Sequence, residues 1–348
     1  MHPALSVVLP THGRRESLLR VLQGLTRQSV PRGTFDVVVV CDGDVDGSAA
    51  ACHALSSTLP FMLHVVEQDN SGPAAARNRG VAEATSPLIL FLDDDVVPED
   101  SLVAAHLAAH ADTDRRVVVG PLLPPPDVRL NLWGAWEEKM LCSQYDDQIR
   151  GRWQTTYRQF HTGNASLLRR HILDAGGFDA RFLRAEDVEL ALRLRDRGLQ
   201  FVFAPEARTL HYVRRTYDAW LRIPAAYGAA AVAMARDGHP ETVQILAREY
   251  RQRHGAIRAL VQLSVGRPIL YRLAASLLGI MVRSVDRTNA IPYGDALCSL
   301  VYNLVFFEGL AGALGGRGAF LDLLRQESAV RLHPPAEPWP GKVGRQEP

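Results

Sequence analysis

The first ~115 residues alternate two hydrophobic periodicities, and this alternation restricts the possible folds more than any other feature of the chain. Short runs rich in β-branched residues predict strands, and longer segments with apolar residues at helical spacing predict helices. The predicted strands are Leu5 to Leu9, Phe35 to Cys41, Phe61 to Val66, Leu88 to Leu92 and Arg116 to Val119. The predicted helices are Ser17 to Gln28, Ser48 to Leu59, Pro73 to Ala84 and Asp100 to Ala111. The pattern predicts a Rossmann-like α/β fold, with a mostly parallel sheet flanked by helices.

In such a sheet the ligand crevice lies at the carboxyl ends of the strands. Polar residues that directly follow a predicted strand are therefore the first candidates for a functional site.

The stretch Pro121 to Pro126 ends the alternation, and the sequence up to about Phe160 is rich in aromatic residues. These aromatics are Trp133, Trp136, Tyr145, Trp153 and Tyr157. We expect an irregular, functional insert, whose rings either offer stacking surfaces to a ligand or belong to the core. Order returns with a predicted strand at His161 to Leu168, a turn at Gly176 and Gly177, a helix at Asp187 to Arg197 and a strand at Phe201 to Ala204.

From about Tyr217 to Leu324 the pattern is helical throughout, and a polar tail that contains prolines follows. We therefore expect three parts: an α/β domain at 1–215, a helical C-terminal subdomain at 216–330 and a polar tail at 331–348.

Charge and cysteine content narrow the function classes. The formal net charge is +1, without the basic excess that a nucleic-acid binder requires, so we expect no nucleic-acid partner. The four cysteines show no spacing typical of a zinc or redox site, and the N-terminus lacks the pattern of a signal peptide. We expect a reduced, cytoplasmic compartment.

Two late segments are strongly apolar: Ile269 to Val282, which contains Arg272, and Ala296 to Gly315, which contains Glu308. The first is shorter than the ~20 residues of a bilayer span, and the second carries a carboxylate. We expect buried helices. Peripheral contact of 269–315 with the inner face of the cell membrane, or pairing of subunits, stays open.

Three consecutive carboxylates, Asp93 to Asp95, directly follow the predicted strand at Leu88 to Leu92. Like charges this close repel, so a cation is expected among them. A hard divalent cation bridging to a substrate diphosphate would serve. Acidic residues also suit a helix N-terminus, and Pro98 and Glu99 follow, so the aspartates alone leave both interpretations open.

Polar residues follow the first two strands as well: Thr11 to Arg14 after the first, and Asp42 to Asp44 after the second. Neighbouring parallel strands bring these loops together, so Thr11, Asp42 and an aspartate of the triplet are expected to converge on one nucleotide. Each loop alone is also an ordinary turn.

The segment Asn70 to Gly80 holds several small residues together with Arg77. The small residues would let a helix lie close to the sheet, and Arg77 could reach a phosphate or orient the aspartates. A capped surface helix is the alternative.

Ala185, Glu186 and Asp187 begin a predicted helix. Transfer of a sugar with inversion needs a carboxylate to take the proton of the acceptor hydroxyl, and Asp187 or Glu186 could serve. A charge pair at a helix start is the alternative.

Together, the order and spacing of these five elements resemble family 2 glycosyltransferases with the GT-A fold, from about Ser6 to His211. The matching stretches are Val7 to Arg14, Val39 to Asp44, Asn70 to Gly80, Phe91 to Asp95, Thr162 to Ser166 and Gly176 to Asp187.

The resemblance implies metal-dependent, inverting transfer from a nucleoside diphosphate sugar to a hydroxyl of a glycan, a lipid-linked or a small-molecule acceptor, as in synthesis of cell envelope polysaccharide. It implies Asp187 as catalytic base, with Glu186 positioning the acceptor, and Mg²⁺ or Mn²⁺ on Asp95 and His211. The nucleotide-sugar contacts that it implies are Pro10, Thr11, Arg14, Asp42, Gly72, Arg77, Asp93 and Asp94. Cys41 replaces an acidic residue that many members carry, which leaves the donor preference open.

Two other functions compete. A phosphohydrolase with an aspartyl nucleophile would also place Asp93 and Asp95 after a strand, but there the first strand of the domain carries them and a downstream lysine assists. Here only Lys139 is available in the body of the chain. The second alternative, a non-catalytic nucleotide-sugar binding protein, would not need Asp187.

Overall fold

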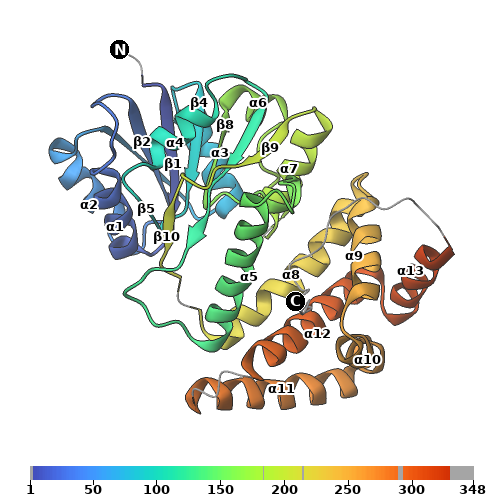
Figure 1. The fold of residues 1–348 in the computed structure, drawn as a ribbon. Helices are drawn as coiled ribbons and strands as arrows, with labels where there is room; N and C mark the ends of the chain where they lie inside the picture. Colours follow the sequence, from blue (N-terminus) through green and yellow to red (C-terminus); the bar gives the residue numbers. More distant parts are fainter. Residues whose placement is uncertain (1–2, 183, 214, 289–292, 330–348) are drawn as a thin grey trace. The chain divides into compact units, whose positions relative to one another are not determined.

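The computed structural model describes residues 3–182, 184–213, 215–288 and 293–329 (Figure 1). The chain divides into two compact units. The first is formed by Met1–Val128 and Tyr145–Val213, and the second by Arg129–Gln144 and Arg214–Pro348. The segment 129–144 thus groups with the helical C-terminal part, so the units are not consecutive stretches of the chain. The polar tail expected at 331–348 lies outside the described residues.

The first unit is built on a seven-stranded sheet in the order β3-β2-β1-β4-β8-β6-β9. Its strands are β1 (Leu5–Thr11), β2 (Phe35–Asp42), β3 (Met62–Gln68), β4 (Leu88–Leu92), β6 (Arg116–Val119), β8 (Asn164–Leu168) and β9 (Gln200–Phe203). All neighbours pair in parallel except β8, which runs antiparallel to both β4 and β6. The predicted mostly parallel α/β sheet is confirmed.

Helices cover both faces of this sheet. They are α1 (Arg15–Leu25), α2 (Ser48–Leu55), α3 (Pro73–Glu83), α4 (Leu102–Ala109), α6 (Arg169–Asp174) and α7 (Glu186–Asp196). Alternate β1 residues Leu5, Val7 and Leu9 share one buried cluster with side chains of α1, α2 and α4. On the opposite face, a Cβ at Gly80 of α3 would lie 2.4 Å from Val8 Cγ1, so the small residue permits the close approach expected from the sequence.

A second, three-stranded sheet has the order β5-β10-β7 and consists of β5 (Val96–Pro98), β7 (Leu122–Leu123) and β10 (Thr209–His211). The antiparallel pairing of β5 with β10 sets His211 opposite Val96. The Tyr212 backbone N–H also donates to the Asp95 carbonyl oxygen at 2.8 Å. This sheet therefore brings the end of the α/β unit back to the aspartate triplet.

The aromatic segment is not the irregular insert that the sequence suggested. Residues Leu132–Ile149 form an 18-residue helix, α5, and a short 3₁₀ turn follows at Tyr157–Gln159. Residues of good helix propensity, among them Leu, Glu, Lys, Met and Gln, make up much of α5, while its apolar residues are not confined to one face. The aromatic side chains of this segment are buried, so they serve as core.

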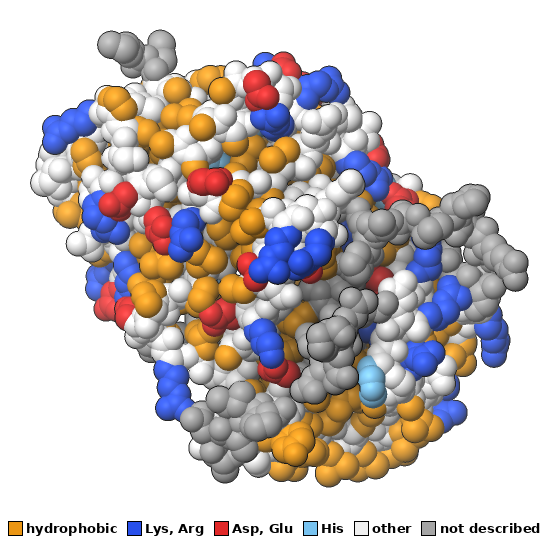
Figure 2. Space-filling model, in the orientation of Figure 1, with side chains coloured by type: hydrophobic (Ala, Val, Ile, Leu, Met, Phe, Trp, Pro, Cys, Tyr) orange, Lys and Arg blue, Asp and Glu red, His pale blue; other side chains and the backbone are white. Residues whose placement is uncertain are grey.

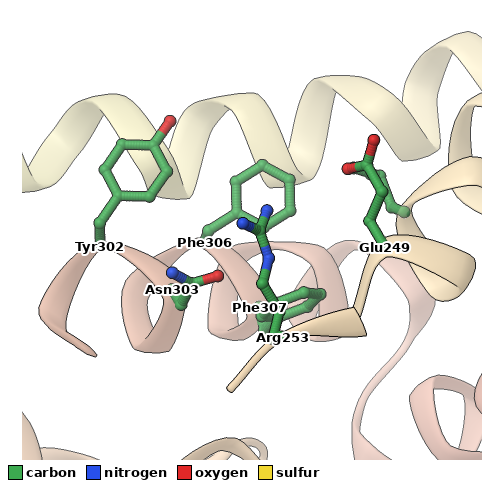
Figure 3. A pocket seen from close by; sticks show the side chains of 7 residues that line it. Glu249, Arg253, Tyr302, Asn303, Phe306 and Phe307 are labelled. Carbon is green, nitrogen blue, oxygen red and sulfur yellow. The ribbon is translucent and has the colours of Figure 1, made fainter. Parts of the chain in front are cut away.

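The second unit is helical. Its helices are α8 (Tyr217–Arg236), α9 (Glu241–Gln252), α10 (Gly255–Ser264), α11 (Pro268–Thr288), α12 (Gly294–Leu314) and α13 (Arg317–Ala329), together with the first part of α5. Helices α8 and α12 lie unusually close, because a Cβ at Gly309 would come within 2.2 Å of the Ala225 carbonyl oxygen. A small pocket between α9 and α12 is lined by Glu249, Arg253, Tyr302 and Asn303, with Leu246, Phe306 and Phe307 (Figure 3).

Helices α11 and α12 are each long and apolar enough to cross a membrane by length and composition alone. Their burial differs sharply. The most apolar window of α12 is 56% buried in the protein, which confirms the expected buried helix, whereas that of α11 is only 11% buried. The expectation of a buried helix is therefore wrong for α11, because only one of its sides packs against the unit.

Candidate active site

Side chains from the carboxyl ends of β1 and β4 meet directly. Thr11 Oγ1 donates to Asp94 Oδ2 at 2.8 Å, and Arg14 Nη1 lies 3.0 Å from both Asp94 Oδ1 and Asp95 Oδ2. Burial raises the pKa of Asp94 to about 6, against the opposing effects of Arg14 and of the Thr11 hydrogen bond. The convergence expected for Thr11 and the aspartate triplet is thus present in the structure.

Arg77 balances the charge of Asp93, the first aspartate of the triplet. Its Nη2 donates to Asp93 Oδ1 at 2.8 Å, and its Nη1 donates to Glu186 Oε1 at 2.7 Å. Burial alone would lower the pKa of Arg77, but the two carboxylates raise it. Partial burial would likewise raise the pKa of Asp93, and the guanidinium outweighs it. Arginines 14 and 77 are therefore cations that offset the repulsion within the triplet.

Asp95 and His211 are the two residues expected to hold a metal ion. His211 Nε2 lies 3.6 Å from Asp95 Oδ1, beyond hydrogen-bond distance but close enough for both atoms to bind one cation. In nucleotide enzymes Mg²⁺ commonly has one or two carboxylate ligands and completes its shell with phosphates and water. Within the described ranges no group of three or more His, Cys, Asp or Glu side chains could hold a metal. The pair fits a cation that is shared with a diphosphate.

Asp42 lies at the end of β2, where its buried carboxylate holds the start of α3. Oδ1 accepts from the backbone N–H of Ser71 and from Gln68 Nε2, and Oδ2 accepts from the Gly72 N–H, each at 2.8 Å. Gly72 has a φ of +86°, a conformation that favours glycine. Each carboxylate oxygen can accept two hydrogen bonds, so Oδ2 retains one position for a ligand donor.

The β1–β2 register places this group beside the triplet. Thr11 pairs with Cys41, and Pro10 pairs with Val40 within the parallel ladder. His12 Nδ1 also lies 2.6 Å from the Asp42 carbonyl oxygen. The Pro10 side chain has no hydrogen-bonding or charged group, so its place in the site follows from the β1–β2 register.

The two acidic residues at the start of α7 differ in their contacts. Glu186 is paired with Arg77, whereas Asp187 Oδ1 accepts the Val188 backbone N–H at 2.8 Å. Burial and the neighbouring carboxylate of Glu186 raise the pKa of Asp187 to about 7. A carboxyl group that titrates near neutral pH is suited to accept a proton in a reaction at that pH.

The backbone just before this pair is strained. Ala185 has a φ of +61°, the only positive φ of a non-glycine residue in the part of the chain that the structure describes. Such strain is concentrated at functional sites, where the surrounding structure maintains it. The turn fixes how Glu186 and Asp187 leave the loop.

His161 also belongs to this region, although the sequence pattern predicted only the start of a strand there. Both ring nitrogens are buried, and neither makes a hydrogen bond within the described residues. Burial lowers the pKa of His161 to about 4, and the ring interacts electrostatically with Asp93 and His211. The next residues also approach the triplet, since a Cβ at Gly163 would lie 3.4 Å from Asp93 Oδ2. The position of His161 directly before the Thr162-Gly163-Asn164 motif was the available signal.

All the predicted site residues belong to the first unit. Asp42 and Gly72 are hydrogen-bonded to each other, and Pro10 lies in β1. Most of the others fall into two connected groups. Thr11, Arg14, Asp94, Asp95 and His211 form one group, and Arg77, Asp93, Glu186 and Asp187 form the other. The triplet joins the two groups, because its members belong to both.

A mostly parallel sheet with these polar strand ends, followed by an acidic helix start, has the architecture of glycosyltransferases of the GT-A fold. Residues 6–177 match the model of Glycosyl transferase family 2, and the chain belongs to this family.

Two curated relatives and one solved structure illustrate the similarity. The chain is 31% identical over 229 residues to validoxylamine A glucosyltransferase of Streptomyces hygroscopicus subsp. jinggangensis, a match that covers 59% of this chain and 54% of that protein. It is 27% identical over 288 residues to the pre-mycofactocin glycosyltransferase of Mycobacterium tuberculosis, covering 80% of this chain and 56% of the relative. The chain thus spans little more than half the length of these relatives.

The solved structure is the mannosyltransferase PcManGT from Pyrobaculum calidifontis, in complex with GDP-Man and Mn²⁺. It aligns with a TM-score of 0.52 and 20% identity, over 97% of this chain and 82% of that chain. At this identity the likeness establishes the shared GT-A fold.

Proposed function

We propose that this protein transfers a sugar from a nucleoside diphosphate sugar to a hydroxyl acceptor, with inversion at the anomeric carbon. The observation that carries the proposal is the pair Glu186 and Asp187. Arg77 ties Glu186 to the first aspartate of the triplet, and Asp187 beside it has a pKa near neutral pH. The donor-side aspartates and a candidate base are thus parts of one connected network.

Asp187 acts as the general base in this proposal. Its carboxylate takes the proton of the acceptor hydroxyl while that oxygen attacks the anomeric carbon. A bond forms between the acceptor oxygen and the anomeric carbon as the bond from that carbon to the diphosphate oxygen breaks. Attack on the face opposite the leaving nucleotide inverts the configuration. Glu186, held by Arg77, positions the acceptor next to the base.

The other residues bind and orient the donor. Thr11 and Asp94 contact the ribose and phosphates, and Asp42 uses the open position on Oδ2 for a donor group of the base or ribose. Arg14 is 56% exposed and lies at the triplet, where its guanidinium can bind phosphate oxygens. Pro10, Gly72 and Arg77 shape the rest of this pocket.

Asp95 and His211 would hold the divalent metal ion, Mg²⁺ or Mn²⁺. The bound cation supplies Lewis-acid stabilisation of the negative charge that develops on the diphosphate. The Mn²⁺ in the PcManGT complex supports the use of a divalent metal ion.

The acceptor is a hydroxyl group of a glycan, a lipid-linked sugar or a small molecule, and the reaction belongs in the cytoplasm or at the inner face of the membrane. A relative named for glucosylation of validoxylamine A supports acceptors outside polysaccharide synthesis. The proposed catalytic part is 1–215, because every residue with an assigned role lies within it.

The phosphohydrolase alternative loses its support in the structure. The triplet follows β4, which is the fourth strand along the chain and not the first. Lys139, the lysine that would have to assist, belongs to the second unit and pairs there with Asp295.

Thermal shift with UDP-, GDP- and dTDP-sugars, with and without Mn²⁺, tests donor binding, because a ligand that binds the native state raises Tm. Asp187→Asn should keep the shift with the best donor and lose transfer. Asp196→Asn, the same change at the exposed end of α7, should keep both. Full-rate transfer by Asp187→Asn would refute the base, and full-rate transfer after chelation would refute the metal role of Asp95.

A further inference from the structure

Helix α11 carries a continuous stripe of exposed apolar side chains. Ile269 is 76% exposed, Leu273 56%, Leu277 62% and Ile280 58%, and Leu270 and Met281 are also exposed. The spacing of three and four residues puts these side chains on one face of the helix along most of its length. Figure 2 shows the hydrophobic side chains gathered along the lower edge of the view, where Figure 1 labels α11. Contiguous exposed apolar surface of this kind marks an interaction site.

The opposite face of α11 is anchored in the second unit. Val282 is fully buried in one core cluster, and Leu278, Tyr271 and Ala275 pack against buried residues of the unit. Asp286 accepts the Leu132 backbone N–H at 2.7 Å. The helix is therefore held on the surface of its unit with one apolar side turned outward.

The exposed charges on α11 and just before it have a single sign. The exposed charged side chains of α11 are Arg272, Arg283 and Arg287, and exposed Arg267 directly precedes the helix. Its one acidic residue, Asp286, is partly buried and engaged with Leu132. An apolar stripe bordered by arginines complements a surface that offers acyl chains beneath anionic head groups.

We propose that the outward face of α11 docks on the surface of an anionic lipid bilayer, with the helix lying in the plane of the interface. A transmembrane orientation is disfavoured because the inner face of α11 is committed to packing within the unit, and arginines lie along the helix. From the sequence, membrane contact was open for all of 269–315; the proposal assigns it to one face of α11. It is independent of the catalytic assignment, because it involves none of the residues assigned to catalysis.

Flotation of the full-length protein with phosphatidylcholine vesicles, with and without phosphatidylglycerol, tests the proposal. We expect binding to the anionic vesicles, weaker binding to the neutral ones and loss of the difference in high salt. The double variant Leu273→Gln/Leu277→Gln should bind at least about tenfold more weakly, since it removes the centre of the apolar stripe. Arg272→Gln/Arg287→Gln should weaken the preference for anionic lipid, because it removes two of the four exposed arginines.

The matched control Met62→Gln/Leu173→Gln changes two exposed apolar side chains of the first unit and should bind vesicles like the wild type. Retention of the donor-induced thermal shift in every variant shows that the fold and the donor site are intact. Failure of vesicle binding in the wild type, or equal binding by Leu273→Gln/Leu277→Gln, overturns the proposal. The proposal is also overturned if the wild type is a dimer and Leu273→Gln/Leu277→Gln is a monomer. The stripe would then bind a second copy of the chain.

Discussion

Arg77 Nη1 lies 2.7 Å from Glu186 Oε1, and this buried ion pair joins α3 to the first residue of α7, 109 positions later in the chain. The same guanidinium donates to Asp93. One arginine therefore sets the position of the aspartate triplet relative to the proposed base. Both side chains of the pair are nearly inaccessible, with 7% and 10% of their surface exposed, so neither charge can turn to water if its partner is removed.

We predict that Arg77→Met lowers the free energy of unfolding by about 3 kcal/mol, because it leaves a buried carboxylate without its counter-charge. Transfer should fall to background. Urea unfolding gives the stability change, provided the slope of the transition is unchanged.

Arg79→Met provides the matched control, since Arg79 lies on the same helix in an exposed pair with Glu83. It should cost less than about 0.5 kcal/mol. Adding Glu186→Gln to Arg77→Met should recover part of the stability and none of the activity. An Arg77→Met variant as stable as Arg79→Met would contradict the importance of this pair.

The pKa of Asp187 predicts the pH dependence of transfer. Because this pKa is raised to about 7, the base is protonated and inactive below that pH, so kcat/KM should fall as the pH drops through about 7. Glu186 contributes to the raised pKa, so Glu186→Gln should move this acidic limb to lower pH. Asp196→Asn should leave the limb in place. A wild-type profile flat from pH 6 to 8 would argue against Asp187 as the base.

Replacing His161 should affect stability and donor binding in different ways. Its buried ring nitrogens lack partners within the described residues, and a buried polar group without a hydrogen bond lowers stability. We predict that His161→Leu leaves the unfolding free energy unchanged or raises it, while donor affinity falls, because the ring lies near Asp93. Thermal shift with and without donor measures both effects.

His106→Leu is the comparison for His161→Leu. His106 is fully buried and also has a pKa lowered to about 4, but it lies 2.7 Å from Ser166 Oγ and 2.9 Å from Asn164 Oδ1. Its replacement should cost about 1 to 3 kcal/mol. An equal loss of stability in His161→Leu would show that His161 has a structural role.

The central strands could be predicted from the sequence because they are buried on both faces. The expected Leu88 to Leu92 strand has the observed bounds, and Leu5 to Leu9 extends by two residues to Thr11. The α5 helix was missed because its apolar residues surround it and show no helical stripe. The strands of the small sheet have two or three residues, too few to show a periodicity, although they bring His211 to Asp95.

Within the site, residue types after strands were enough to select Thr11, Asp42 and the triplet. Their partners were not predictable, because they come from distant parts of the chain. Nothing local to Asp42 indicates that its carboxylate accepts the N–H groups of Ser71 and Gly72. The same holds for Arg14, which contacts residues about 80 positions away.

The left-handed backbone at Ala185 could not be predicted from the sequence, because alanine disfavours this conformation. The conformation leads to a prediction about stability. This conformation costs an L-residue with a Cβ about 1 to 2 kcal/mol, and glycine adopts it without that cost. Ala185→Gly should therefore raise the unfolding free energy by about 1 kcal/mol and retain transfer, because glycine keeps the φ of +61° that directs Asp187. Ala51→Gly, inside α2, should instead lower it by about 1 kcal/mol. If Ala185→Gly lost stability as Ala51→Gly does, the turn before Glu186 would store no backbone strain.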